Sequence, residues 1–341
     1  MASDSSLQRP TDLTVENVGE YLVSREVFED VGNIDVHELG GGVSNVVLVA
    51  RQNDRRVVVK QALGRLRVAD EWLATKERAI TEGEALGLAD RLIPNSVPAV
   101  LDLDRESCAL TISEAPASWK NWKEQLLRGN ADPLIAARLG EWLGSWQVET
   151  FENPDIKRQF ASYQSFEELR IEPFYETSAQ RRPELRASID MFVENMRARR
   201  VCLVHGDFSP KNILVGDGFW VLDFEVAHYG DPVFDVAFML SHLFVKRLHF
   251  PTASHELEHC IEEFWSAYQK IATSHLSPIA YVIGHVGCLM VARVDGKSPV
   301  EYLTIAERDT ARQVGSEFLL DPPNSIDEAL TIVARVARRS E

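Results

Sequence analysis

Four side chains with oxygen donors lie close together in the middle of the chain, within residues 201–235. Asp207 and Asn212 come first, and Asp223 and Glu225 follow after a short gap. Carboxylate and amide oxygens are ligands that Mg²⁺ prefers, usually together with substrate phosphates. We therefore expect Asn212 and Asp223 to bind a metal ion. Asp207 can accept or orient the proton of a hydroxyl group that attacks phosphorus.

The residues around this group allow more than one role. Glu225 is either a ligand of a second Mg²⁺ or a hydrogen-bond acceptor within its loop, and the sequence leaves both roles open. We expect His205 to make a structural hydrogen bond behind the loop and not to act as a catalytic base. Asp235, at the start of the next predicted helix, is expected to hold the loop in place.

A lysine and a glycine-rich segment precede this group in the N-terminal part of the chain. Lys60 ends a predicted strand, where its ammonium group can reach phosphate oxygens, and Glu82 on the following predicted helix can pair with it. Glu84 is the alternative partner, because only the register of that helix separates the two. Glycines leave backbone N–H groups open to phosphates. The candidate phosphate loop consists of Gly40, Gly41, Gly42, Val43 and Ser44.

Each of these features alone has a simpler explanation. Consecutive glycines form a turn more often than a phosphate site, a lysine at a strand end is usually solvated, and aspartate favours turns. A metal site, a lysine, a glycine loop and an acid beside the attacking hydroxyl are together the recurring parts of phosphoryl transfer. Their combination in one chain favours the catalytic interpretation.

Short apolar strands must position the central group. Residues 201–204, 213–215 and 219–222 are apolar runs of strand length. The sequence Gly216-Asp217-Gly218 is a turn of the kind that joins paired strands. The polar residues follow these strands, so we expect the strand ends to bring them to one place.

The chain divides into a strand-rich part and a helical part. Strands are predicted over 36–39, 43–50, 56–61, 99–103 and 108–113, with a helix over 76–89. Asp132 followed by Pro133 starts a long amphipathic helix, and helices continue beyond residue 232, interrupted at prolines. We predict an α+β fold with a disordered tail at 1–11, a small, mainly antiparallel N-terminal lobe at 12–115 and a larger, mainly helical lobe at 116–341.

Charge and composition exclude several classes of protein. The chain of 341 residues has 36 lysines and arginines against 52 aspartates and glutamates, a formal net charge of −16. Nucleic-acid binding usually needs a concentrated basic surface, so we expect no nucleic-acid partner. The four cysteines lie far apart, which argues against a zinc site or a disulfide framework. The sequence shows no signal peptide and no apolar run long enough for a membrane span, which predicts a cytoplasmic protein without a membrane partner.

The order of these motifs resembles the protein-kinase-like fold: a glycine loop, VVVK ending at Lys60, a helical glutamate, HGDFSPKN at 205–212 and VLDFE at 221–225. More closely, it resembles the aminoglycoside phosphotransferase and choline kinase superfamily of small-molecule kinases. Within that superfamily, KQALGRLRV at 60–68 and the two acids of VLDFE are most similar to methylthioribose kinases. The resemblance implies a two-lobe fold and the use of ATP and Mg²⁺.

The resemblance also implies roles for single residues. Asp207 matches the catalytic base of the superfamily, and Asn212 and Asp223 match its metal ligands. Arg293 corresponds to one of an arginine pair that contacts the sugar in methylthioribose kinases. The hinge that presents backbone groups to adenine falls on Ser113, Glu114 and Ala115.

The sequence therefore predicts ATP- and Mg²⁺-dependent transfer of a γ-phosphoryl group to a hydroxyl of a small metabolite, with a methylthioribose-like sugar as the first candidate. An aminoglycoside or a choline-like amino alcohol is the alternative acceptor. A nucleotide-binding pseudokinase scaffold is the alternative of another class, although such proteins usually lose the lysine, the catalytic acid or the metal acid. The expected partners are ATP and a small hydroxyl-bearing acceptor.

Overall fold

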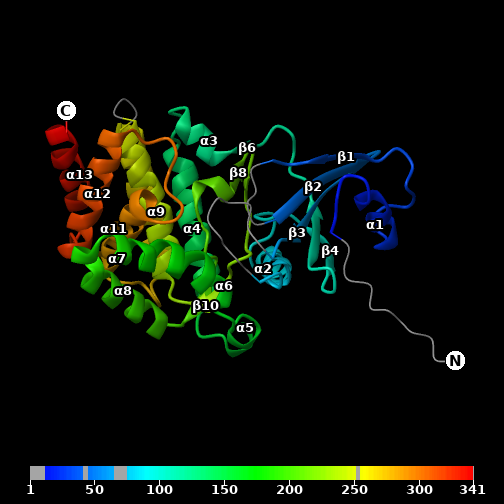
Figure 1. Cartoon of the computed structure of the whole chain (residues 1–341), viewed down its shortest axis with the longest axis horizontal. Helices are drawn as coiled ribbons and strands as arrows, with labels where there is room; N and C mark the ends of the chain where they lie inside the picture. The colour runs from blue at the N-terminus through cyan, green and yellow to red at the C-terminus, as the bar shows by residue number, and fades with distance from the viewer. Residues whose placement is uncertain (1–11, 41–44, 65–74, 251–253, 341) are drawn as a thin grey trace.

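The computed structural model describes residues 12–40, 45–64, 75–250 and 254–340. Its N-terminal part contains a five-stranded antiparallel sheet with the strand order β1-β2-β3-β5-β4 (Figure 1). The strands are β1 (Asp35–Glu38), β2 (Asn45–Gln52), β3 (Arg55–Ala62), β4 (Val100–Asp104) and β5 (Ala109–Ser113). Val57 and Val59 of β3 lie on one face of the sheet and are buried, as alternation in a strand requires.

Two helices flank this sheet. α2 (Arg78–Leu92) packs against β4 and β5. Gly83 permits the close packing, because a Cβ there would meet Leu103 Cδ1 at 2.8 Å. α1 (Val18–Ser24) contacts β2 and buries Val18 and Leu22. The packing fixes α2 beside β3, the strand that carries Lys60.

The rest of the described chain is mainly helical. The helices are α3 (Trp122–Leu127), α4 (Pro133–Glu149), α5 (Pro154–Gln159), α6 (Gln164–Phe166), α7 (Thr177–Arg181), α8 (Arg186–Ala198), α9 (Val233–His249), α10 (Ser254–Ile271), α11 (Ile279–Asp295), α12 (Ile305–Leu320) and α13 (Ile326–Ser340). α4 packs along α10, and α11 packs against α9 and α12. Figure 1 shows α12 and α13 at the end of the molecule farthest from the five-stranded sheet.

Short strands form two further small sheets that carry the loops of the central sequence group. β7 (Cys202–Val204) pairs with β10 (His228–Gly230), and β8 (Ile213–Val215) pairs with both β6 (Lys120–Asn121) and β9 (Phe219–Val221). The predicted strands near β7, β8 and β9 are confirmed. β6 and β10 were not predicted, because each has two or three residues and depends on a partner distant in sequence.

One helical segment departs from regular α geometry. Residues Glu167–Glu176 form a π-helix between α6 and α7, with Pro173 inside it. π-helical turns are rare and occur often at functional sites. The segment carries Arg170, whose side chain is directed toward the loop after β7.

The predicted two-lobe α+β fold is confirmed, with an antiparallel sheet in the N-terminal lobe and helices in most of the remainder (Figure 1). The lobe boundary between residues 115 and 116 stays a prediction, and the predicted tail at residues 1–11 lies outside the described residues. Within the described ranges, none of the helices combines the length and the apolar character that crossing a membrane requires.

Candidate active site

Buried aromatic residues anchor the two loops that carry Asp207 and Asp223. Phe208 and Phe224 directly follow these aspartates, and both are fully buried. Trp142 of α4 contacts both rings, stacking on Phe208 with centroids 5.5 Å apart and meeting Phe224 edge-on at 6.2 Å. Because each aspartate is joined to an anchored ring, the packing of α4 fixes the position of both carboxylates.

Asp235, in the first turn of α9, holds the backbone that leads to Asp207. Its carboxylate accepts hydrogen bonds from the N–H groups of His205 at 2.7 Å and Gly206 at 2.9 Å. Gly206 has a φ of 80°, and a Cβ there would meet the Val226 carbonyl oxygen at 2.6 Å, so the position requires glycine. The predicted loop-holding role of Asp235 is confirmed.

His205 connects the two loops through both ring nitrogens. Nδ1 accepts from the backbone N–H of Asp207 at 3.1 Å, and Nε2 lies 3.1 Å from the carbonyl oxygen of Leu222. An amide N–H only donates and a carbonyl only accepts, so these partners assign the neutral tautomer with its proton on Nε2. Burial lowers the pKa of His205 to about 4, which keeps the ring neutral. The structural role predicted for His205 is confirmed.

Asp207 is 3% exposed and is surrounded by donors. Arg170 Nη2 lies 3.0 Å from Oδ1, Lys211 Nζ lies 2.8 Å from Oδ2, and Asn212 Nδ2 donates to Oδ2 at 2.8 Å. Burial raises the pKa of Asp207, but the positive charges of Arg170 and Lys211 outweigh burial and lower the pKa below its ordinary value. The carboxylate is therefore ionised at neutral pH and able to accept a hydrogen bond from a hydroxyl group.

Lys60 lies between two carboxylates, one from each lobe. Its Nζ is 2.6 Å from Glu82 Oε1 on α2 and 2.8 Å from Asp223 Oδ1. Glu84, the alternative partner, instead contacts Arg105 at 2.6 Å. Burial lowers the pKa of Lys60, but the charges of Asp223 and Glu82 outweigh burial and raise the pKa above its ordinary value. The ammonium group is thus charged and placed beside the predicted metal ligand.

Asp223 combines an unusual backbone with a low pKa. Its φ is 70°, in the left-handed region that residues other than glycine rarely adopt. Burial raises the pKa of Asp223, but the charge of Lys60, followed by that of Lys211, outweighs burial and holds the pKa well below its usual range. Backbone strain of this kind is concentrated at functional sites.

Glu225 joins the loop after β9 to the N-terminal lobe. Its Oε2 accepts from Asn45 Nδ2 of β2 at 2.8 Å and from Arg78 Nε of α2 at 3.0 Å. The Arg78 side chain is 0% exposed and that of Glu225 is 8% exposed, so this is a buried ion pair between the lobes. The hydrogen-bonding role is therefore present, and metal contact by Glu225 stays a prediction.

The donor set at this point fits one kind of metal. Across residues 12–40, 45–64, 75–250 and 254–340, no group of three His, Cys, Asp or Glu side chains is arranged to hold an ion. Mg²⁺ does not need such a group, because it takes one or two carboxylates and completes its shell with water and substrate phosphates. Asp223 supplies a carboxylate. The amide nitrogen of Asn212 is turned to Asp207, which leaves the side-chain oxygen of Asn212 for a cation.

Other predicted site residues belong to the glycine-rich segment and the hinge. Gly40 follows β1, and a Cβ there would meet nothing within 4 Å. Gly41, Gly42, Val43 and Ser44 lie outside the described residues. In the predicted hinge, the N–H groups of Ser113 and Glu114 donate to the carbonyls of Ala99 and Arg56, and the Glu114 carboxylate pairs with Arg51.

Arg293, the predicted substrate contact, lies near the end of α11. Its Nη1 donates to the Ser298 carbonyl at 2.8 Å, and its guanidinium lies 6.0 Å from the ring centroid of Phe174. Phe174 belongs to the π-helix that also carries Arg170. The structure thus places Arg293 beside the segment that supplies Arg170 to Asp207.

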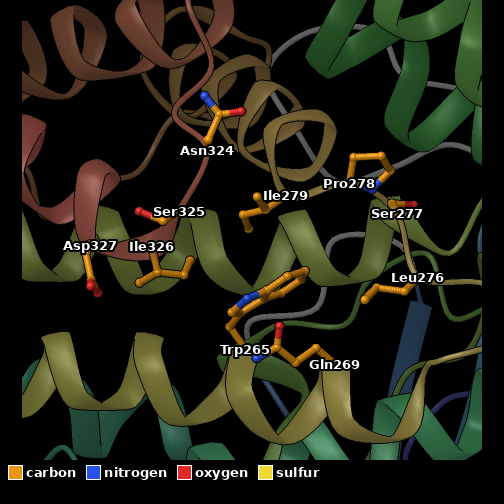
Figure 2. Close-up of a pocket in the computed structure, with 10 residues that line it drawn as sticks. All are labelled: Trp265, Gln269, Leu276, Ser277, Pro278, Ile279, Asn324, Ser325, Ile326 and Asp327. Atoms are coloured by element: carbon orange, nitrogen blue, oxygen red, sulfur yellow. The ribbon is translucent and has the colours of Figure 1, made fainter.

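A surface pocket of about 580 Å³ lies elsewhere, between α10, the start of α11 and the start of α13 (Figure 2). Figure 2 shows Trp265 and Gln269 of α10 on one side and Ile326 and Asp327 of α13 on another. None of the predicted site residues lines this pocket, so its size alone does not make it the active site.

Three residues of the site were missed from sequence. Lys211 could have been predicted as a partner of Asp207, because it lies four positions after Asp207 in the same motif. Arg170 had only an indirect signal, a proline inside a helical stretch, which marks irregular helix geometry. Arg78 had none, because a cation at a helix start is normally exposed and its ion pair with Glu225 joins residues far apart in the sequence.

Comparison with known proteins identifies the class. The profile described as "Phosphotransferase enzyme family" matches residues 35–275, which is most of the chain. The protein is therefore a phosphotransferase. The chain belongs to this family, and the resemblance inferred from the sequence motifs is confirmed.

Curated relatives cover nearly the whole chain at low identity. The methylthioribose kinase of Bacillus cereus (strain AH187) is 24% identical over 361 residues, covering 90% of this chain and 90% of that protein. The methylthioribose kinase of Geobacillus sp. (strain WCH70) is 25% identical over 358 residues, with 90% and 89% covered.

Solved structures share the fold. The ethanolamine kinase of Plasmodium vivax has a TM-score of 0.55 at 11% identity, covering 95% of this chain and 89% of that chain. A choline/ethanolamine kinase family protein from Mesorhizobium loti has a TM-score of 0.51 at 14% identity, covering 95% and 99%. At identities this low, the structural similarity establishes the fold alone. It confirms the predicted protein-kinase-like architecture.

Proposed function

We propose that this phosphotransferase is an ATP- and Mg²⁺-dependent small-molecule kinase that phosphorylates a hydroxyl group of a small metabolite. The observation that carries the proposal is the arrangement around Asp207 and Asp223. An ionised, buried aspartate is held beside Asn212, and a charged lysine is held against Asp223, on loops anchored by the same helix. These are the parts that phosphoryl transfer requires.

In this proposal the N-terminal lobe binds ATP and the helical lobe supplies the catalytic aspartate. Lys60 and the segment at residues 40–44 meet the phosphates of ATP, with Glu82 orienting Lys60. The backbone of the hinge, Ser113 to Ala115, meets adenine. Asp207 orients the acceptor hydroxyl and takes its proton as the oxygen attacks phosphorus.

The metal would be held by Asn212 and Asp223, with Glu225 as a further candidate ligand. When bound, Mg²⁺ neutralises charge on the phosphates. Lys211 and Arg170 keep the Asp207 carboxylate oriented and ionised whether or not a metal is present. The proposed location of the protein is the cytoplasm.

The names of the relatives give the first acceptors to assay. A methylthioribose-like sugar comes first, because methylthioribose kinases match 90% of this chain. Choline, ethanolamine and aminoglycosides follow. A nucleotide-binding scaffold without catalysis is the competing function, and it predicts ATP binding without turnover on any hydroxyl compound.

The test is the substitution Asp207→Asn, with ATP consumption measured against the acceptor panel. We expect kcat to fall roughly 10²–10⁴-fold, because general-base assistance acts in the transition state. ATP affinity, followed by thermal shift, should change little. Asp217→Asn, at the exposed hairpin turn, is the matched control and should retain activity. Normal turnover in Asp207→Asn would contradict the assignment.

A further inference from the structure

Basic side chains gather in one group in the helical lobe, and in the described residues none of the group's lysines or arginines forms an ion pair with a carboxylate. We call this group the basic cluster, and it consists of Lys123 of α3, His242 and Lys246 of α9, and Arg293 of α11. Lys246 is 0% exposed, and its Nζ makes one long hydrogen bond, 3.4 Å, to the carbonyl of His242. Within the described part of the chain, no carboxylate lies at ion-pair distance from Lys123, Lys246 or Arg293.

Burial and the charges of the basic cluster lower the pKa values of its two lysines. Burial, followed by the charges of Arg293 and Lys123, lowers the pKa of Lys246 to about 7. Burial, followed by the charge of Arg293, also lowers the pKa of Lys123. In addition, Arg293 Nε and Tyr302 Oη are buried atoms without a hydrogen-bond partner in the described structure. Burying unpaired like charges costs stability, so folding alone does not account for the cluster.

The basic cluster adjoins the catalytic carboxylate on the acceptor side. Arg293 and Arg170 lie over the same ring, that of Phe174, at 6.0 and 5.6 Å. Arg170 in turn lies 3.0 Å from Asp207. Arg293 of the cluster therefore shares an aromatic contact with the arginine that pairs with Asp207.

A second connection runs through α3. Asn121, the residue before α3, donates from Nδ2 to the carbonyl oxygen of Lys211 at 2.6 Å. This bond ties the start of α3 to the loop that carries Asn212, so Lys123 in the first turn of α3 lies at the edge of the same site. Lys123 is partly exposed, and it therefore offers a solvent-accessible face of the cluster.

We propose that the basic cluster binds a negatively charged group, a carboxylate or a phosphate, on the acceptor whose hydroxyl meets Asp207. The inference rests on the proposed function for the identity of the acceptor. Lys123 and Arg293, which are partly exposed, contact the anion, and Lys246 adds charge from behind them. The nearby Glu301 is exposed and makes no ion pair with them.

The proposal separates acceptor classes by charge. A hydroxy acid or a sugar phosphate supplies the missing negative charge and makes charge-assisted hydrogen bonds with the cluster. A choline-like amino alcohol or an aminoglycoside is positively charged and would be repelled by the basic cluster. On this proposal the acceptor is an anionic hydroxy compound, which ranks such compounds ahead of the methylthioribose-like sugar, choline and the aminoglycosides in the acceptor panel.

Binding is measured by isothermal titration calorimetry on the full chain with Mg²⁺ and ADP present. The probes are two pairs, glycerate with glycerol and ribose 5-phosphate with ribose, together with choline. We expect at least one anion to bind about tenfold or more tightly than its neutral partner, since hydrogen bonds to charged groups are the stronger ones. The two pairs separate a carboxylate from a phosphate as the recognised group. Equal affinities within both pairs, or tighter binding of choline, would overturn the proposal.

Lys246→Met gives a second readout that a structural role would not produce. We expect this variant to melt at a higher temperature than wild type, because it removes a buried charge at similar volume, while the melting-temperature increase caused by inorganic phosphate becomes smaller. Lys270→Met, on the exposed face of α10, is the control and should keep the wild-type response to phosphate. An unchanged phosphate response in Lys246→Met would sink the proposal.

The two proposals fail separately. Anion binding is measured without turnover, so it holds or falls whatever Asp207→Asn does to catalysis. Phosphorylation of a neutral or cationic acceptor, with no preference for anions, would leave the kinase function standing and end the anion-site proposal. Selective anion binding without ATP-dependent phosphorylation would support the site and contradict the proposed kinase function.

Discussion

At the scale of single residues, the site is organised by pairs of opposite charge whose members come from distant parts of the chain. Lys60 meets Glu82 and Asp223, and Asp207 meets Arg170. Each pair is largely buried, so removing one partner weakens the compensation of a buried charge. These pairs therefore hold the ionisation states that phosphoryl transfer needs before any ligand binds.

The Lys60–Glu82 pair gives a prediction with a control two residues away. Glu82→Gln should lower kcat/KM for ATP about tenfold or more, because Lys60 loses the carboxylate that orients it. Glu84→Gln should leave this parameter near wild type, since Glu84 pairs with Arg105 and not with Lys60. Initial-rate kinetics at varied ATP concentration measure both. Equal losses in the two variants would show that Glu82 has no special role.

Lys246 gives a prediction on pH. Burial, followed by the charges of Arg293 and Lys123, lowers its pKa in the folded chain from the ordinary value of 10.5 to about 7. Between these two pH values the unfolded chain binds a proton that the folded chain does not, so stability rises with pH in this window. Relative to Lys246→Met, wild type should gain roughly 1.4 kcal/mol per pH unit above pH 7.

Urea denaturation of both chains at several pH values between 7 and 9 measures this difference. Lys270→Met serves as the control, because its side chain is exposed and should show no such trend relative to wild type. A difference between wild type and Lys246→Met that is constant over the window would mean that Lys246 keeps an ordinary pKa.

At the scale of elements, the site depends on how closely α4 packs against its neighbours. α4 supplies Trp142 to both catalytic loops, and its other side meets α10 at Gly140. A Cβ at Gly140 would lie 2.3 Å from the Phe264 carbonyl oxygen of α10, so any side chain forces the two helices apart.

Gly140→Ala should therefore destabilise the protein by about 2 kcal/mol or more, within the range of overpacked cores. Gly87→Ala in α2 is the matched helical control, because the nearest atom to its Cβ is the Arg91 side chain at 3.8 Å. There we expect a gain of about 0.5–1 kcal/mol from helix propensity. Urea denaturation of both variants checks the opposite signs, and a stabilised Gly140→Ala would contradict the packing argument.

The sequence predicted those helices and strands whose signals lie within a few neighbouring residues. The strands around Lys60 and the helix that starts at Pro133 carry their signals within a few residues, runs of valines in one case and an N-cap in the other. β10 and the π-helix at 167–176 do not, because their geometry depends on distant partners. The candidate site followed the same division: Asp207 and Asp223 were found from motif spacing, whereas Arg170 is brought in only by tertiary packing.

At the scale of the whole molecule, the two lobes are joined by buried charge. Glu225 accepts from Asn45 and Arg78, and Lys60 reaches across to Asp223. The net charge of −16 is thus less informative than the placement of a few cations. The bridges pair cations with carboxylates between the lobes, whereas the lysines and arginine of the basic cluster form no ion pair in the described residues.

The Arg78–Glu225 pair gives a prediction at this scale. Glu225→Gln should destabilise the chain by about 3–5 kcal/mol, because it removes a buried carboxylate that pairs with the fully buried Arg78. The double variant Arg78→Met with Glu225→Gln should lose less than the sum of the two single variants, as coupled neighbours do. A double-mutant cycle in urea measures the coupling, and strict additivity would rule out an energetic link between the lobes at this point.

The winding of residues 167–176 has a consequence for how this enzyme can change over evolution. A π-helix takes i→i+5 hydrogen bonds instead of i→i+4, so it accommodates residues that an α-helix of the same length would not. If one residue before Arg170 were lost and the segment relaxed to α geometry, the Arg170 side chain would rotate by about 100° around the helix axis. This rotation would carry the guanidinium away from Asp207. Insertions and deletions here are therefore expected to alter catalysis without touching a catalytic residue, whereas single substitutions on the outer face are tolerated.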